Sequence, residues 1–306
     1  MFTDNAFVTI LLCSSIGVKN DNYKPFTALQ WSGLVVKIIN SAVKEPSRLL
    51  NMSPREIVEV LLVSLEDAER ICSLLSRGAN VALAMESFER KGIKVVTRSD
   101  KHYPKRLKSV LKKNAPPVLY YCGDISLANY KGIAIVGSRD IDESGNRFAE
   151  KLASKAVDER LIVYSGGARG VDGISEKAAL DKGGRVVSVI ADSLAERIKK
   201  REIRSYITDG KLLLLTAVNP DAAFSPASAM NRNKYVYALS SGAFIVASDY
   251  NKGGTWAGAT DNIKNKWVNS YVWDNGNYKG NGELIKLGAT AIDSALDISI
   301  KELIDQ

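Results

Sequence analysis

The sequence predicts an α/β fold in which a doubly wound, mostly parallel sheet follows a small helical domain. From residue 93 onward, short apolar runs alternate with segments of helical periodicity, and several runs are apolar throughout. Continuous apolar runs are typical of strands covered on both faces, and their alternation with helices of crossover length is typical of parallel sheets. Before residue 93, the apolar residues recur at helical spacing instead.

We expect a helical N-terminal domain over residues 1–92 and a sheet domain over residues 93–306. Ser53-Pro54-Arg55-Glu56 resembles a helix start, with proline in the first turn. Apolar residues then follow a helical period as far as Gly78, so one helical run is predicted from residue 53 to residue 78.

Eight runs are predicted as strands, and the segments between them are mostly helical. Between residues 143 and 159, for example, Phe148, Leu152 and Ala156 form one apolar stripe. The tail after Ala291 is too short for another domain. The predicted strands lie within residues 93–97, 117–123, 132–138, 160–166, 184–192, 211–217, 242–249 and 269–274.

The composition is that of a globular protein with a surplus of positive charge. Of 306 residues, 45% are apolar and 25% are charged, and 42 Lys and Arg exceed 34 Asp and Glu, giving a formal charge of +8. The surplus favours an anionic partner such as nucleic acid or nucleotide. Cys13, Cys72 and Cys122 are widely spaced, and the apolar run near the N-terminus is too short to span a bilayer. We therefore expect a reduced, cytoplasmic chain without a leader or membrane segment.

Two glycine-rich turns each follow a predicted strand, and each carries an arginine. They are Gly137-Ser138-Arg139 and Ser165-Gly166-Gly167-Ala168-Arg169-Gly170. Ligands of open parallel sheets bind at the carboxyl ends of strands, where glycines let backbone amides approach an anion. Arginine adds a planar donor suited to phosphate oxygens. We expect both turns to hold a phosphate, in a basic pocket that also contains Arg232, Lys234 and Lys252.

Two alternatives to a phosphate site stay open at this point. Arg169 could pair with Asp172 and merely lock its turn. Asp192, about twenty residues beyond the glycine turn, could bind a ribose, although the segment around it looks more like a helix cap. Among the aromatic residues near the basic segments, Trp256 is the better candidate for stacking on a base, because Tyr235 and Tyr237 fit the buried face of a helix.

The sequence lacks the signatures of the common enzyme classes. Neither turn has the GxGxxG spacing, and no GxxxxGK[ST] motif occurs. His102 is the only histidine and fits a surface position, so a usual zinc site and a Ser-His-Asp triad are both excluded. We expect a binding protein without catalytic residues, metal or cofactor.

The motifs together resemble the DprA/Smf family. The segments "IAIVGSRD", "YSGGARGVDGISEKAAL", "NRNKYVYALSSGAFIVASD" and "KGGTWAGA" occur in order at the spacing of that family, and the resemblance covers about residues 93–292. It implies an extended Rossmann fold that binds single-stranded DNA without sequence preference. The family's site residues match Gly137, Ser138, Arg139, Ser165, Gly166, Gly167, Arg169, Gly170, Arg232, Asn233 and Lys234.

The resemblance also carries expectations about partners. It implies a homodimer and, in natural transformation, transfer of the strand to a RecA-type recombinase. Three departures indicate a divergent branch: Glu176 lies near the place of a histidine in many members, "KGGTWAGA" replaces a commoner form, and a C-terminal winged-helix domain is not expected. Such branches also occur in phage-defence cassettes, so a regulator or antitoxin paired with a cognate toxin is a variant of this hypothesis.

The leading hypothesis is therefore a non-enzymatic protein that binds single-stranded DNA. The alternative is a sensor of a small nucleotide, because related Rossmann folds use the same kind of glycine turn for a nucleotide phosphate.

Overall fold

The computed structural model describes residues 3–18 and 23–305, which divide into two compact units. The first unit holds the chain up to Tyr103, together with Leu111–Tyr120 and Ala217–Pro220. The second holds Pro104–Val110, Tyr121–Thr216 and the chain from Asp221 onward. The predicted domain boundary near residue 92 stays a prediction. No helix in the described ranges has both the length and the apolar character needed to cross a bilayer.

The first unit is mainly helical, as predicted. Thr27 and Ser53 each form a capping box at the start of a helix. The side chain of each accepts the backbone N–H of the third helical residue, whose own side chain accepts the backbone N–H of Thr27 or Ser53. The apolar faces of the helices pack together in the core, and Trp31, Ile57 and Ile71 are among its buried residues. The helices are α1 (Asp4–Cys13), α2 (Ala28–Asn40), η1 (Pro46–Asn51), α3 (Pro54–Leu61), α4 (Leu65–Leu75) and α5 (Gly78–Arg90), followed by strand β1 (Lys94–Thr97).

The single helical run predicted from residue 53 to residue 78 is wrong, because two helices occupy it. Helix α3 ends at Leu61, and Leu62 adopts a left-handed conformation with a φ of 51°. Ser64 then caps α4 by accepting the N–H of Asp67. Leu65, one of the apolar residues within this run, is 54% exposed. The apolar period continues across the break, so it concealed the turn between the two helices.

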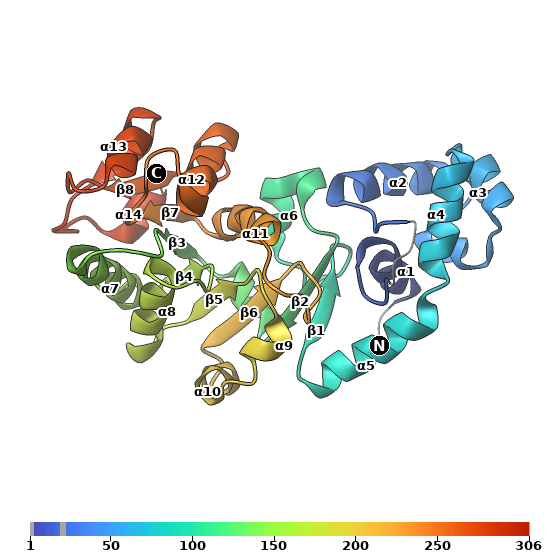
Figure 1. Ribbon diagram of the computed structural model, residues 1–306, viewed down its shortest axis with the longest axis horizontal. Coiled ribbons are helices and arrows are strands. Elements are labelled where there is room, and N and C mark those ends of the chain that lie inside the picture. Colours follow the sequence, from blue (N-terminus) through green and yellow to red (C-terminus); the bar gives the residue numbers. More distant parts are fainter. Residues whose placement is uncertain (1–2, 19–22, 306) are drawn as a thin grey trace. The chain divides into compact units, whose positions relative to one another are not determined.

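Seven neighbouring strands of the sheet lie in the second unit, in the order β6-β5-β4-β3-β7-β8-β9, and Figure 1 labels all of them except β9. Every described pair of neighbours in this stretch is parallel. The fold class predicted from the continuous apolar runs is confirmed. The strands are β3 (Gly132–Val136), β4 (Ile162–Ser165), β5 (Val186–Val189), β6 (Leu212–Thr216), β7 (Gly242–Ile245), β8 (Ser270–Trp273) and β9 (Thr290–Ile292), and β2 (Val118–Cys122) spans both units.

Helices cover both faces of this sheet. Helices α7 and α8 pack against each other and against β3 and β4, while α11 packs on β3, β4 and β5 from the other side (Figure 1). Phe148 of α7 stacks on Trp273 of β8 with ring centroids 4.2 Å apart, which confirms the predicted apolar stripe. The short helix η2 (Lys112–Asn114) belongs to the first unit. The helices of the second unit are α6 (Lys105–Leu111), η3 (Ile125–Asn129), α7 (Glu143–Asp158), α8 (Val171–Asp181), α9 (Leu194–Arg197), α10 (Arg201–Thr208), α11 (Pro226–Leu239), α12 (Gly253–Asn265), α13 (Lys279–Lys286) and α14 (Ile300–Asp305).

The strand order reverses at β3. The chain runs from β3 through β4 and β5 to β6, then returns to β7 on the opposite side of β3 and continues to β9. The loops after β3 and β7 therefore leave in opposite directions, and a crevice opens at the carboxyl ends of these strands. Strand β9 was not predicted, because only three residues form it and two of them are exposed.

Candidate nucleic-acid interface

A pocket of about 420 Å³ lies in the crevice at the carboxyl ends of β3 and β7. Four segments that are distant in sequence form its walls: the turn after β3, the turn from β4 into α8, the chain from Phe224 through α11, and the loop from β7 into α12. The residues that line it are Val136, Gly137, Ser138, Arg139, Ala168, Asp172, Phe224, Pro226, Ala229, Met230, Arg232, Asn233, Tyr237, Asp249, Lys252, Gly253, Gly254 and Thr255.

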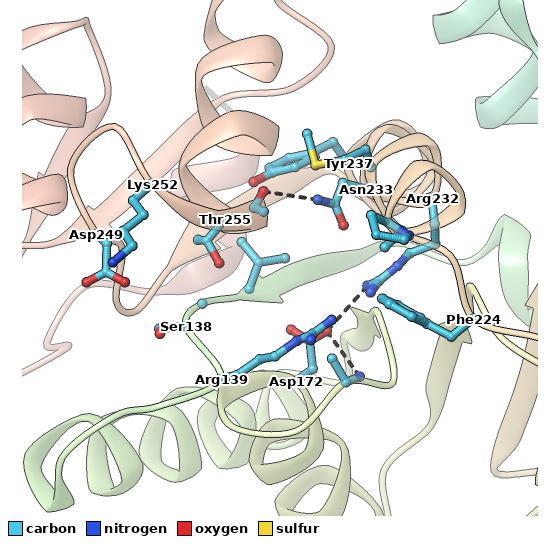
Figure 2. A pocket seen from close by; sticks show the side chains of 18 residues that line it. Ser138, Arg139, Asp172, Phe224, Arg232, Asn233, Tyr237, Asp249, Lys252 and Thr255 are labelled. Atoms are coloured by element: carbon cyan, nitrogen blue, oxygen red, sulfur yellow. Dashed lines mark hydrogen bonds and ion pairs between the residues drawn. The ribbon is translucent and has the colours of Figure 1, made fainter.

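Positive charge reaches this pocket from opposite sides. Figure 2 shows Lys252 beside Asp249 at one side, and Arg139 near Asp172 and Phe224 at the other. Arg139 and Lys252 are both exposed. Lys252 immediately precedes α12, a helix whose first turn lines the pocket and has no capping side chain. Uncapped N–H groups and the positive end of the helix dipole both favour an anion at this position.

The two glycine turns predicted from the sequence are in direct contact. The N–H of Val171 donates to the carbonyl of Ser138 at 3.2 Å, which joins the start of α8 to the turn after β3. Gly170 has a φ of 73°, and a Cβ built on it would lie 2.4 Å from the carbonyl oxygen of Ser138. Only glycine fits here, because both the conformation and the space exclude a side chain.

A buried ion pair lies between α8 and α11. Arg232 Nη1 is 3.3 Å from Asp172 Oδ2, and both side chains are about nine-tenths buried. The guanidinium lies directly over Gly166, where a Cβ would be 1.1 Å from Nη1. Burial raises the pKa of Asp172, and Arg232 opposes that rise. The alternative in which Arg169 pairs with Asp172 is therefore wrong, because Arg232 takes that place.

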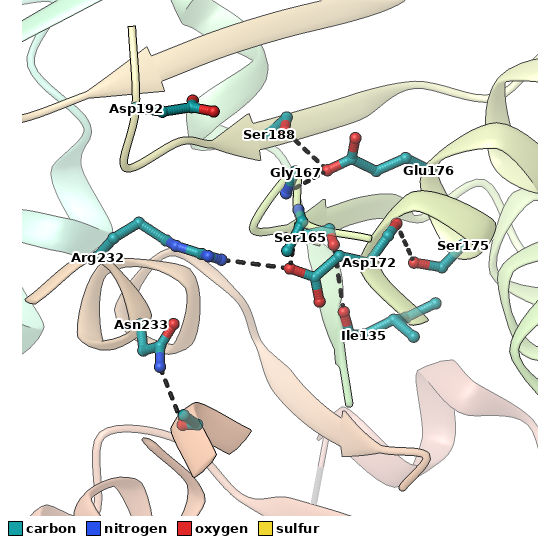
Figure 3. Close-up of polar contacts among 12 residues, drawn as sticks. Ile135, Ser165, Gly167, Asp172, Ser175, Glu176, Ser188, Asp192, Arg232 and Asn233 are labelled. Atoms are coloured by element: carbon teal, nitrogen blue, oxygen red, sulfur yellow. Dashed lines mark hydrogen bonds and ion pairs between the residues drawn. The ribbon is translucent and has the colours of Figure 1, made fainter. Parts of the chain in front are cut away.

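Carboxylate oxygens of α8 accept hydrogen bonds from backbone N–H groups of the second glycine turn. Asp172 Oδ2 accepts the N–H of Ala168 at 3.3 Å, and Glu176 Oε1 accepts the N–H of Gly167 at 2.9 Å (Figure 3). In the first turn, the N–H of Ser138 donates to the carbonyl of Ala247 at 2.9 Å. The structure thus differs from the expected amide cradle: these N–H groups have internal partners, and the exposed donors are side chains and the start of α12.

The predicted site residues separate into four groups, of which the last, Gly167 and Arg169, lines a second pocket. Gly137, Ser138, Arg139, Arg232, Asn233 and Lys252 line the pocket, and Asn233 Nδ2 also donates to the carbonyl of Gly254 at 3.0 Å. Ser165, Gly166 and Gly170 lie behind the walls and shape the turn. Lys234 does not line the pocket; its Nζ donates to Asn231 at 3.3 Å, and partial burial lowers its pKa.

Gly167 and Arg169 line a second, neighbouring pocket of about 530 Å³. This pocket also receives Arg197 and Lys200, and it shares Ala168 and Phe224 with the first pocket. Its remaining lining residues are Asp192, Ser193, Glu196 and Ala223. The two pockets are therefore adjacent and separated by these shared residues.

Asp192 is held by Arg197 in this second pocket. Arg197 Nε and Nη2 each donate to one carboxylate oxygen of Asp192 at 2.9 Å. The interpretation of Asp192 as a helix cap is wrong by one residue, since Ser193 accepts the N–H of Glu196 and begins α9. A bidentate arginine leaves Asp192 poorly placed to receive a ribose hydroxyl.

Sequence reasoning missed Phe224. Its side chain is 50% exposed and lines both pockets. The centroid of its ring lies 5.5 Å from the guanidinium carbon of Arg139. An aromatic residue in the short segment after the strand at 212–216 was the available signal. Tyr235 and Tyr237 are buried, as their helical pattern predicted, and Trp256 packs edge-on against Tyr250.

Within residues 3–18 and 23–305, no group of three or more His, Cys, Asp or Glu side chains could hold a metal ion. What the site offers is a basic crevice beside an exposed aromatic ring. Such an arrangement can bind a phosphate-bearing ligand and stack against a planar group.

Comparison with known proteins identifies the family of the chain. Residues 94–302 match the family model of DNA recombination-mediator protein A. The DNA processing protein DprA of Streptococcus pneumoniae is 32% identical over 117 residues, which cover 38% of this chain and 40% of the relative. DprA of Bacillus subtilis is 29% identical over 165 residues, covering 53% of this chain and 54% of the relative. The chain thus spans about half the length of these curated relatives, or less.

Two solved structures share the fold. The X-ray structure of DprA from Streptococcus pneumoniae superposes with a TM-score of 0.69 at 19% identity, covering 95% of both chains. DprA from Helicobacter pylori superposes with a TM-score of 0.55 at 24% identity, covering 70% of this chain and 94% of that one. The resemblance seen in the ordered motifs is confirmed. The chain belongs to the DprA/Smf family of DNA recombination-mediator proteins.

Proposed function

We propose that the second unit binds single-stranded DNA, without sequence preference and without catalysis. The observation that carries this proposal is the basic crevice at the switch point of the sheet. Arg139, Arg169 and Lys252 are exposed and form no ion pair among the residues that the structure describes. Unpaired surface cations beside a concave wall are suited to contact a phosphate backbone.

The path of the strand is proposed from the two adjacent pockets. Phosphates contact Arg139, Lys252 and the start of α12 in the first pocket, and Arg169 and Lys200 in the second. Phe224 lies where the pockets meet and stacks on a base between them. Stacking on an aromatic ring contributes about 1–3 kcal/mol per base and tolerates any sequence. Phosphate contacts and stacking together explain binding without base readout.

Comparison with relatives supports this proposal. The solved structure of DprA from Helicobacter pylori is described as giving insight into a single-stranded DNA binding mode of that protein. The curated relatives from two bacteria are named DNA processing proteins. We extend these descriptions to the present chain as a role in DNA processing during transformation.

A small-nucleotide sensor is the weaker candidate. That function needs an acid free to receive a ribose, and Asp192 is engaged on both oxygens by Arg197. An oligonucleotide, in contrast, uses both pockets at once. A mononucleotide that competes fully with an oligonucleotide at equal phosphate concentration would reverse this ranking.

Partners beyond DNA stay predictions from the family resemblance. They are a homodimer, a RecA-type recombinase that receives the strand, and, for a phage-defence variant, a cognate toxin. Light scattering of the full chain tests the dimer. Co-purification with a recombinase or with the product of a neighbouring gene separates the other two.

Fluorescence anisotropy with single-stranded, double-stranded and mononucleotide ligands tests the proposal. We expect the single strand to bind most tightly. Lys252→Ala removes a cation at the start of α12, whereas the control Lys264→Ala removes an exposed cation near the end of the same helix. Lys252→Ala should weaken binding about fivefold at low salt, and Lys264→Ala should change it little. Equal effects of the two changes would place the DNA elsewhere.

A further inference from the structure

A carboxyl group lies behind the wall of the second pocket. Glu176 Oε1 accepts the N–H of Gly167 at 2.9 Å and the hydroxyl of Ser188 at 2.7 Å (Figure 3). Gly167 itself lines the pocket. The Glu176 carboxyl therefore fastens the glycine turn to β5 and is separated from the pocket by one hydrogen-bonded residue. Nothing in the proposed DNA contacts uses this group.

Charged groups face this carboxyl from several elements. On its own helix, Asp172 lies one turn earlier, and Arg232 of α11 pairs with it. Arg197 of α9 approaches Gly167 and is itself held by Asp192, while Ser188 of β5 is uncharged. Burial is the largest influence and raises the pKa of Glu176 to about 7. Asp172 raises it too, whereas the Ser188 and Gly167 bonds and Arg197 lower it.

Both hydrogen bonds end on the same oxygen of Glu176. A proton can therefore occupy Oε2 while Oε1 keeps its two donors. The carboxyl can lose its charge without releasing the turn. Glutamine reproduces this state, because its amide oxygen accepts both bonds and carries no charge.

We propose that Glu176 positions the glycine turn and that binding of a phosphodiester backbone in the second pocket is coupled to proton uptake by its carboxyl group. This coupling rests on the proposed function. A phosphate in the pocket brings a negative charge to the wall behind which the carboxyl lies, so the ionised carboxylate and the phosphate repel each other. The neutral carboxyl is therefore favoured in the complex. Affinity increases as the pH falls, by at most about tenfold per pH unit for one proton.

The affinity for a thymidine oligonucleotide, measured between about pH 6 and about pH 8 at constant ionic strength, tests this coupling. Wild-type protein should bind several-fold more weakly at the higher pH, whereas Glu176→Gln should keep the low-pH affinity throughout. Calorimetry near neutral pH in two buffers of different ionisation enthalpy should detect proton uptake in the wild type and none in Glu176→Gln. A role in turn structure alone predicts neither difference.

Two further variants make the test decisive. Ser188→Ala removes a hydrogen bond that lowers the pKa of Glu176, so the midpoint of the pH profile should move upward. His102→Gln removes the only histidine, which lies in the first unit, and should leave the profile unchanged. The same pH dependence and proton uptake in wild type and Glu176→Gln would overturn the coupling while leaving DNA binding intact. Absence of binding at every pH would instead overturn the proposed function, and the coupling with it.

Discussion

At the scale of single residues, the central feature is the buried pair of Asp172 and Arg232. The sequence predicted that Arg232 belongs to the basic pocket, and the structure places it in the wall of the first pocket. Its charge is largely neutralised there, however, and its Nε has no hydrogen-bond partner among the described residues. Arg232 therefore shapes the site by lying over Gly166, while the exposed cations Arg139 and Lys252 carry the free charge.

Removing one partner of this pair should destabilise the fold. Asp172→Ala leaves a buried guanidinium without a counter-charge, which costs about 3–5 kcal/mol in comparable cases. Replacing both residues with leucine removes both charges and should restore much of the loss. Urea denaturation of the single and double variants measures this difference. A loss below about 1 kcal/mol in Asp172→Ala would show that the pair is not buried in solution.

The pH dependence of stability should reveal the raised pKa of Glu176. Its pKa is about 7 in the folded chain, against an ordinary value of 4.5. The folded state therefore binds more protons between these values, so the Glu176 contribution to stability falls as the pH rises through this window. Glu176→Gln should be more stable than wild type by about 1–3 kcal/mol above pH 7, and the difference should vanish near pH 4. A constant difference across the window would contradict the raised pKa.

At the scale of elements, the two glycine turns act as one unit because they touch. The sequence predicted both turns and their place after strands, because local glycine and strand patterns determine these features. It could not predict that Asp172 and Glu176 take the amides of the second turn, or that Arg232 crosses to Asp172. The contact of Arg232 joins two elements, and only the packing of α8 and α11 determines it. The two carboxylate contacts depend on how the turn folds back on the start of α8. Phe224 was missed for the same reason, since its exposure depends on the loop that carries it.

Contact between the turns can be tested at Gly170. Gly170→Ala places a Cβ 2.4 Å from the carbonyl oxygen of Ser138, so the turns must separate. Gly210 is a control for the positive φ alone, because its φ of 68° is similar but its Cβ would meet nothing within 4 Å. Gly210→Ala should cost about 1 kcal/mol from its left-handed conformation alone. Gly170→Ala should cost clearly more in thermal denaturation and also weaken DNA binding, and equal costs would argue against the contact.

At the scale of the whole molecule, the formal charge of +8 favours an anionic partner without locating it. The switch of strand order supports the proposed position for that partner, because the turns after β3 and β7 form walls of the crevice. The sequence predicted this sheet class and eight of the nine strands that the structure describes, β1 to β8, from apolar runs. It missed β9, whose three residues carry no apolar run, and the break between α3 and α4, which the continuing apolar period concealed.

The central claim is that exposed arginines at the carboxyl edge of the sheet bind the DNA backbone, and a salt titration tests it most directly. The double variant Arg139→Ala with Arg169→Ala removes two cations after β3 and β4. The control Arg160→Ala with Arg185→Ala removes two exposed cations that precede β4 and β5, at the opposite edge. We predict that the first pair weakens binding strongly at low salt and reduces the log–log salt slope by about 1.4, roughly 0.7 per lost phosphate contact, while the control pair leaves the slope unchanged. An unchanged slope in the first pair, or an equal reduction in both, would contradict this account.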